Sequence, residues 1–230
     1  MNAVAVNSSL KERIKGALIF GVIVLGALYA GGAAFALLML AATAIGISEW
    51  LHMVRQEKKY RLPFMIFGTA YISISCGFMA WLRIDTVYGL YNMLTLLLIV
   101  WASDISAYFS GRAIGGPKLA PKISPKKTWA GFIGSSVGAG LVAAGLACPY
   151  LLAKFNVATV GHLSPIAYGA IGFVLAMFGQ AGDLLISVFK RRYGVKDTGD
   201  IIPGHGGLLD RIDALLLVAL IFGSIVVILR

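Results

Sequence analysis

Four carboxylates lie within or beside strongly apolar stretches: Asp104 in WASDISAYFSGR, Asp183 in FGQAGDLLISVFKR, and Asp210 and Asp213 in LLDRIDALLLV. A carboxylate at the centre of a membrane helix costs roughly 2.5 to 3.5 kcal/mol on insertion, so such residues are functional candidates. Carboxylate oxygens are ligands that Mg²⁺ takes together with substrate phosphate oxygens. The four acids therefore predict a magnesium and polyphosphate site, provided that the fold brings them together.

Each acid also has a structural alternative. Tyr108 and Arg112 follow Asp104 by four and eight residues, so they share its helical face, and Asp104 could simply pair with Arg112. Asp210 and Asp213 face the same way at the start of an apolar run, where acidic residues also suit a helix N-terminus.

Asp183 shares its helical face with Gly179, Ser187 and Lys190. Gly179 and Gly182 favour a close helix–helix contact at this point, which is the structural alternative for Asp183.

A basic segment, residues 111–131, supplies the counterpart that a phosphate site needs, with five cations separated by Pro and Gly: Arg112, Lys118, Lys122, Lys126 and Lys127. Lysines bind phosphate as compact point charges, and glycine permits close backbone approach. A loop that is basic only to remain cytoplasmic is the alternative. There is no GxxxxGK[ST] pattern, so the segment is not a P-loop.

The polar stretch 187–213 contains the turn PGHGG. A single His205 without a second His or Cys nearby is a poor zinc site. It could donate to a phosphate, stack on a base, or satisfy the turn. Gly206 and Gly207 predict tight backbone with exposed amides, which suits a phosphate or the edge of a base.

The composition indicates the class of protein that carries these residues. The chain has 230 residues, of which 59% are hydrophobic and 13% charged, about half the charged fraction of a soluble domain. Continuous apolar runs near 20 residues predict an all-α bundle of membrane helices. The net charge of +10 sits in short loops, so we expect membrane orientation and phosphate binding, with no nucleic acid partner.

Seven spans are predicted: residues 16–29, 33–50, 63–82, 88–109, 129–152, 165–189 and 210–229. The first two divide at Gly31 and Gly32, because one straight helix of the whole run would be about 52 Å long. The N-terminal segment has features of a signal peptide, but we expect a retained helix. Seven spans with a cytoplasmic N-terminus place 17 of the 20 basic residues in the cytoplasm.

The spacing of the polar residues after the sixth span resembles the signature of the phosphatidate cytidylyltransferase family, the CDP-diacylglycerol synthases. The signature positions are occupied by Ser187, Lys190, Arg191, Lys196, Asp197, Pro203, His205, Gly206, Gly207, Asp210, Arg211 and Asp213. The segments SDISAYFSGRAIGGPKLAPKISPKKTWAG and GQAGDLLIS are similar to the family's other two motifs. The motifs lie in residues 101–230 of a single membrane domain, residues 1–230, whose first hundred residues match only as apolar helices.

The resemblance implies that CTP and phosphatidate react to give CDP-diacylglycerol and pyrophosphate, with Mg²⁺ held by Asp183 and Asp210. It implies phosphate contacts on CTP or the lipid head for the cations Lys126, Lys127, Lys190, Arg191 and Lys196. Asp104, Asp197 and Asp213 would orient the site or hold a second cation. Tyr108, Arg112, Ser187, His205, Gly206, Gly207 and Arg211 complete the expected substrate-binding set. We expect an integral membrane protein of a bacterial inner membrane, with its active site facing the cytoplasm. Its expected partners are CTP, phosphatidate and membrane lipid, and a second copy of the chain is a candidate partner.

Three alternatives stay open at the sequence level. Another enzyme that uses CTP on a lipid, such as a polyprenol kinase or an isoprenoid-lipid cytidylyltransferase, would share the metal and lysine features. An ion-coupled transporter would place acids near the bilayer midplane in broken helices, with internal symmetry, and neither feature is evident here. A non-catalytic scaffold would tolerate Asp183→Asn.

Overall fold

The computed structural model describes residue 16 and residues 18–84, 88–148, 163–201 and 206–228. Six helices are long and apolar enough to cross a membrane: α2 Gly32–Val54, α3 Arg61–Ile84, α4 Gly89–Ala113, α5 Trp129–Leu146, α7 Pro165–Arg192 and α8 Leu209–Ile228. A shorter apolar helix, Leu18–Ala30, precedes them. The protein is therefore an integral membrane helix bundle, as predicted.

The division of the first apolar run at Gly31 is confirmed. Gly31 has φ +89°, in the left-handed region that favours glycine, and it separates the helix Leu18–Ala30 from α2. Arg83 Nε, at the end of α3, donates to the carbonyl oxygen of Leu28 at 2.9 Å and so caps the shorter helix. This helix is shorter than the other spans, and the residues before Gly16 lie outside the described part of the chain.

Short-range signals set the ends of two helices that carry the polar residues. Thr128 accepts a hydrogen bond from Gly131 N at 3.1 Å and caps α5. Ser164 accepts from Ala167 N at 3.3 Å before Pro165, the residue that begins α7. At its other end α7 stops before Gly194, which has φ +67°.

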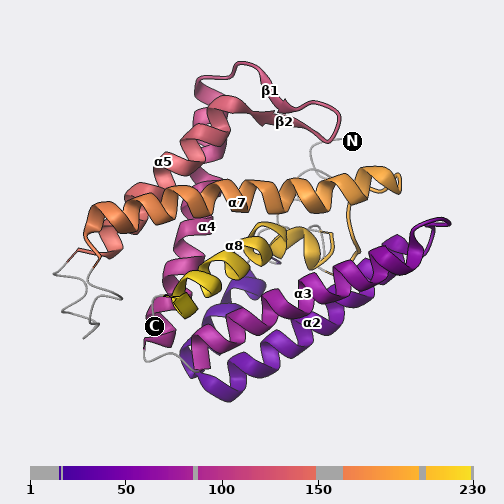
Figure 1. Cartoon of the computed structure of the whole chain (residues 1–230), viewed down its shortest axis with the longest axis horizontal. Coiled ribbons are helices and arrows are strands. Elements are labelled where there is room, and N and C mark those ends of the chain that lie inside the picture. The colour runs from indigo at the N-terminus through magenta and orange to yellow at the C-terminus, as the bar shows by residue number, and fades with distance from the viewer. Residues whose placement is uncertain (1–15, 17, 85–87, 149–162, 202–205, 229–230) are drawn as a thin grey trace, which may run out of the picture.

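In Figure 1, α2 and α3 form an antiparallel pair, and α8 lies between this pair and α7. Helix α5 packs against both α4 and α7. Small residues allow the close approach of α7 and α8. A Cβ atom at Gly182 would lie 2.8 Å from the carbonyl oxygen of Asp213, and one at Gly179 would lie 3.2 Å from a Val218 methyl group. The predicted close contact through Gly179 and Gly182 is confirmed, and it brings the helix of Asp183 against the helix of Asp210.

The basic segment is more ordered than the predicted loop. After α4 it forms an antiparallel hairpin of β1 Lys118–Ala120 and β2 Ser124–Thr128, with Lys118 opposite Thr128. Neighbouring residues of a strand point to opposite sides, so Lys126 is exposed whereas the side chain of Lys127 is only 18% exposed. The hairpin is a small addition to a predominantly helical fold, and it aims Lys127 at α7.

Candidate functional site

Asp183 lies on α7 opposite the hairpin. Lys127 Nζ is 2.6 Å from Asp183 Oδ2 and donates to Gln180 Oε1 at 2.8 Å, while Ser187 Oγ donates to Asp183 Oδ1 at 3.2 Å. The side chain of Asp183 is 33% exposed, which leaves its carboxylate accessible. An ion pair that water can reach has a small net free energy, so an incoming anion can displace Lys127 from Asp183 at little cost.

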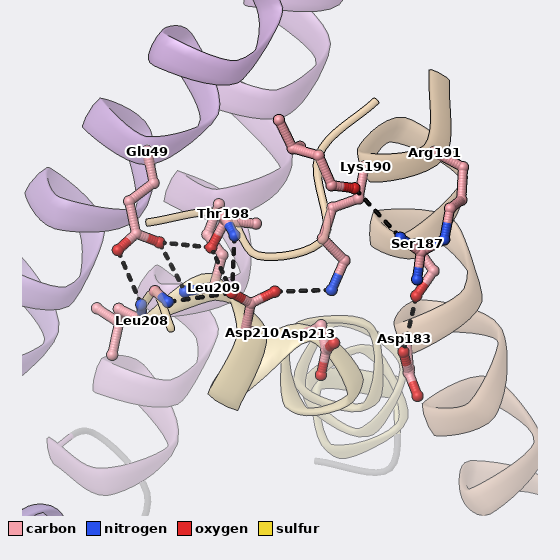
Figure 2. A network of polar contacts seen from close by, with 12 residues as sticks. Glu49, Asp183, Ser187, Lys190, Arg191, Thr198, Leu208, Leu209, Asp210 and Asp213 are labelled. Atoms are coloured by element: carbon pink, nitrogen blue, oxygen red, sulfur yellow. Dashed lines mark hydrogen bonds and ion pairs between the residues drawn. The ribbon is translucent and has the colours of Figure 1, made fainter. Parts of the chain in front are cut away.

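Asp210, in the first turn of α8, is much more enclosed. Its side chain is 4% exposed, and Oδ1 is 2.7 Å from Lys190 Nζ. Oδ2 accepts hydrogen bonds from Thr198 N at 2.7 Å, Thr198 Oγ1 at 3.1 Å and Gly207 N at 3.0 Å. Figure 2 shows this network between the loop that contains Thr198, which connects α7 to α8, and the start of α8. The buried charge is thus compensated by one cation and three neutral donors.

Asp104 and Asp213 belong to the same electrostatic group as Asp183. Both lie within range of the charge of Asp183, and Lys127 lies within range of both. Figure 2 shows Asp213 on α8 between Asp210 and Asp183. Like charges this close repel unless cations compensate them. Asp104, Asp183 and Asp213 therefore share one electrostatic environment with Lys127, and Lys190, the ion-pair partner of Asp210, lies within range of Asp213.

Other predicted residues lie at the rim. Arg191 joins α7 to the hairpin, because Nε donates to Ile123 O at 3.1 Å and Nη1 to Val195 O at 3.2 Å. Arg112 Nη1 donates to Tyr108 Oη at 2.7 Å. No ion pair joins Arg112 to Asp104 in the described part of the chain, so that alternative for Asp104 is wrong.

The remaining predicted site residues are four exposed charged residues, Gly206 and His205. Lys126, Lys196, Asp197 and Arg211 are exposed at the surface of this region. Gly206 has φ +82°, and a Cβ there would lie 2.9 Å from Asp210 Oδ2, so this glycine lets the backbone approach the carboxylate. His205 lies outside the described residues.

A further carboxylate, that of Glu57 in the connection between α2 and α3, holds the end of α7 in place. Arg192 Nη2 is 2.8 Å from Glu57 Oε2, and the Tyr193 hydroxyl donates to the same oxygen at 3.2 Å. Burial raises the pKa of Glu57, but the hydrogen bonds from Lys59 N, Arg192 and Tyr60 N outweigh it and hold the pKa below the ordinary value of 4.5. The contact therefore stabilises the fold above pH 4.5 and is lost as the pH falls further.

Three polar residues of the site are absent from the sequence-based set. Gln180 binds Lys127, Thr198 binds Asp210, and Glu49 of α2 accepts from Thr198 Oγ1 at 3.0 Å. Glu49 carries a readable signal, because it is an acid at the end of an apolar run, like Asp104, Asp183, Asp210 and Asp213. Gln180 lies in the segment GQAGDLLIS, which is similar to a family motif, whereas Thr198 carries no signal, since a neutral polar residue in a connection between helices is common.

The donor set is compatible with Mg²⁺. Among the described residues no group of three or more His, Cys, Asp or Glu side chains is arranged to hold a metal ion. Mg²⁺ does not require one, because it keeps several waters and binds through one or two carboxylates plus substrate phosphates. From the described residues Asp183 accepts two hydrogen bonds and is accessible, whereas Asp210 accepts four and would have to exchange one of them.

Comparison with known proteins places these residues in a family. The family model described as the cytidylyltransferase family matches residues 58–229. A phosphatidate cytidylyltransferase of Brucella abortus biovar 1 (strain 9-941) is 35% identical over 265 aligned residues, covering 95% of this chain and 94% of the relative. One of Rickettsia bellii (strain RML369-C) is 39% identical over 182 residues, covering 79% of this chain and 75% of the relative. The similarity thus extends beyond the C-terminal motifs, and the chain belongs to the cytidylyltransferase family.

Proposed function

We propose that this protein is a phosphatidate cytidylyltransferase. A phosphate oxygen of phosphatidate attacks the α-phosphorus of CTP, the bond from that phosphorus to the bridging oxygen of the β-phosphate breaks, and pyrophosphate leaves. The observation that carries the proposal is the pair of neighbouring lysine–carboxylate contacts, Lys127 with Asp183 and Lys190 with Asp210. The substrates are those after which the Brucella and Rickettsia relatives are named.

The side chains of the site can bind and orient two anionic substrates. Lys127 and Lys190 are already directed by carboxylates, so little side-chain freedom is lost when they turn to phosphate. Exposed Lys126, Arg191 and Lys196 add positive charge at the entrance. Such a reaction requires positioning and charge neutralisation and no covalent enzyme intermediate.

Mg²⁺ belongs to the proposal as the cofactor. Asp183 and Asp210 would hold it, and Asp104, Asp197 or Asp213 could serve a second cation. When bound, the metal neutralises phosphate charge and aligns the reacting groups.

The location also belongs to the proposal. The hairpin, the end of α7 and the start of α8 lie at the ends of spans that carry most of the basic residues, which favours the cytoplasmic side of a bacterial inner membrane. A site at that depth can receive CTP from water and phosphatidate from the bilayer.

The test is product analysis with purified protein, CTP labelled at the α-phosphate, and defined lipids. We expect CDP-diacylglycerol and pyrophosphate in equal amounts when phosphatidate and Mg²⁺ are present. Parallel reactions contain a polyprenol or a polyprenyl phosphate in place of phosphatidate. Product from either of these, and none from phosphatidate, would contradict the proposal in favour of another lipid acceptor.

The two adjacent lysines of β2 should differ in effect. Lys127→Ala removes the cation that contacts Asp183 and Gln180, so we expect kcat/KM for CTP to fall by about 100-fold. Exposed Lys126 contacts the phosphates from the rim, so Lys126→Ala should cost about 10-fold or less. Lys58→Ala, in the α2–α3 connection, is the control and should retain the wild-type rate. Equal losses for Lys126→Ala and Lys127→Ala would contradict the inward role of Lys127.

A further inference from the structure

Glu49 is a buried acid in the part of the chain that precedes the family match. It lies in α2, whose residues all come before residue 58, and only 5% of the residue is exposed. Its carboxylate accepts hydrogen bonds from Leu208 N at 2.8 Å, Leu209 N at 2.9 Å and Thr198 Oγ1 at 3.0 Å. A buried carboxylate is stable only with such donors, so the contact is specific and not incidental.

Two of these donors belong to the start of α8. Leu208 immediately precedes the helix and Leu209 begins it. The first N–H groups of a helix lack partners within it, and the helix dipole favours a negative charge there. Glu49 thus caps α8 from another helix, one residue before Asp210. The cap determines where the helix that carries Asp210 begins.

The third donor connects Glu49 directly to Asp210. Thr198 Oγ1 lies 3.0 Å from Glu49 Oε2 and 3.1 Å from Asp210 Oδ2, and Thr198 N donates to the same Asp210 oxygen at 2.7 Å. Figure 2 shows Thr198 between the two carboxylates. A hydroxyl has one hydrogen, so the two acids share it, and a displacement of Glu49 changes the donors available to Asp210.

The loop can approach Glu49 only because it has glycines at two positions. A Cβ at Gly207 would collide with Thr198 Oγ1 and lie 2.6 Å from Glu49 Oε2. A Cβ at Gly199 would lie 3.0 Å from Glu49 Oε1. The space beside Gly207 is therefore occupied by Glu49 and Thr198, and this glycine of the motif serves the contact between α2 and the loop.

We propose that Glu49 is a positioning residue for cytidylyl transfer. Through Thr198 and the N–H groups of Leu208 and Leu209, it holds the loop and the start of α8 so that Asp210 meets Lys190. The inference rests on the proposed function, and it assigns a role in the reaction to a residue outside the family match. A misplacement of about 1 Å in a catalytic constellation can cost 100-fold in rate, so the expected effect is large.

The test compares four single variants, with kcat and KM for CTP measured per folded protein after size-exclusion chromatography. Glu49→Gln places an NH₂ group against N–H donors, and we expect kcat to fall by about 10- to 100-fold with a smaller change in KM. Thr198→Val should lower kcat similarly, whereas Thr198→Ser retains the hydroxyl and should stay within about 3-fold of wild type. Glu57→Gln removes the same charge from the contact between the α2–α3 connection and the end of α7, and should stay near wild type.

A double variant separates positioning from general loss of structure. Glu49→Gln with Thr198→Val should cost less than the sum of the two single losses, because both substitutions disturb the same Glu49–Thr198 hydrogen bond, which can be lost only once. A wild-type kcat in Glu49→Gln, equal losses in Glu49→Gln and Glu57→Gln, or no rescue by Thr198→Ser would overturn the positioning role. If Glu49→Gln does not fold, the comparison of Thr198→Val with Thr198→Ser decides whether the positioning role holds. Absence of CDP-diacylglycerol from the wild-type protein contradicts the proposed function instead.

Discussion

Asp183→Asn should lower kcat/KM for CTP by at least about 100-fold while the protein still folds and inserts. The replacement keeps the shape of the side chain and an oxygen that can accept from Ser187 Oγ. Lys127 keeps Gln180 Oε1 as an acceptor at 2.8 Å, so no buried charge is left without a partner. What is lost is the accessible negative charge of the site, which can hold a divalent cation and direct Lys127. The measurement is the rate of CDP-diacylglycerol formation over a range of CTP concentrations.

Asp200→Asn is the matched control. Asp200 is an exposed carboxylate in the same polar segment, and its removal changes the net charge equally. We expect its activity to stay within about 2-fold of wild type, because exposed charges are screened by salt. If Asp183→Asn also retained wild-type activity, the non-catalytic scaffold would replace the proposed site. If both variants lost activity equally, the effect would be one of overall charge.

The helices could be predicted from the sequence because apolar runs of about 20 residues leave few other structures in a membrane. The predicted span 165–189 corresponds to α7, which continues to Arg192 because basic residues suit the last turn of a helix. The hairpin could not be predicted, since its strands have only three and five residues and contain Lys and Pro. Its pairing depends on the turn and on contacts with α5.

A contact of the site could be predicted from the sequence where both of its residues lie on one helix. Ser187 and Asp183 are four residues apart on α7, so helical periodicity places them in contact. Contacts between distant segments could not be predicted, because they depend on how helices pack. Lys127 reaches Gln180 across 53 residues of sequence, and Glu49 reaches Thr198 across 149. The motifs identify the types of residue in the site, whereas the pairing of each lysine with its carboxylate requires the fold.

Asp210→Asn should destabilise the protein by about 3 to 5 kcal/mol and also abolish activity. Lys190 and Asp210 are 10% and 4% exposed, and removal of one charge from a buried pair leaves the other uncompensated. The amide cannot satisfy both sides of the site. If its oxygen faces Lys190, its NH₂ group faces Thr198 N and Gly207 N, and the opposite orientation sets the NH₂ group against the ammonium.

A double-mutant cycle with Lys190→Met separates stability from chemistry, because the cause of the instability is the unpaired ammonium. Lys190→Met alone leaves Asp210 with its three neutral donors, so it should destabilise the protein less than Asp210→Asn does. The double variant removes both charges and should be more stable than Asp210→Asn alone, which corresponds to a coupling of about 1 to 3 kcal/mol. Denaturant or thermal unfolding in detergent measures this, and strictly additive losses would contradict the buried pair. All three variants should remain inactive, because the restored stability returns neither the cation for phosphate nor the carboxylate of Asp210.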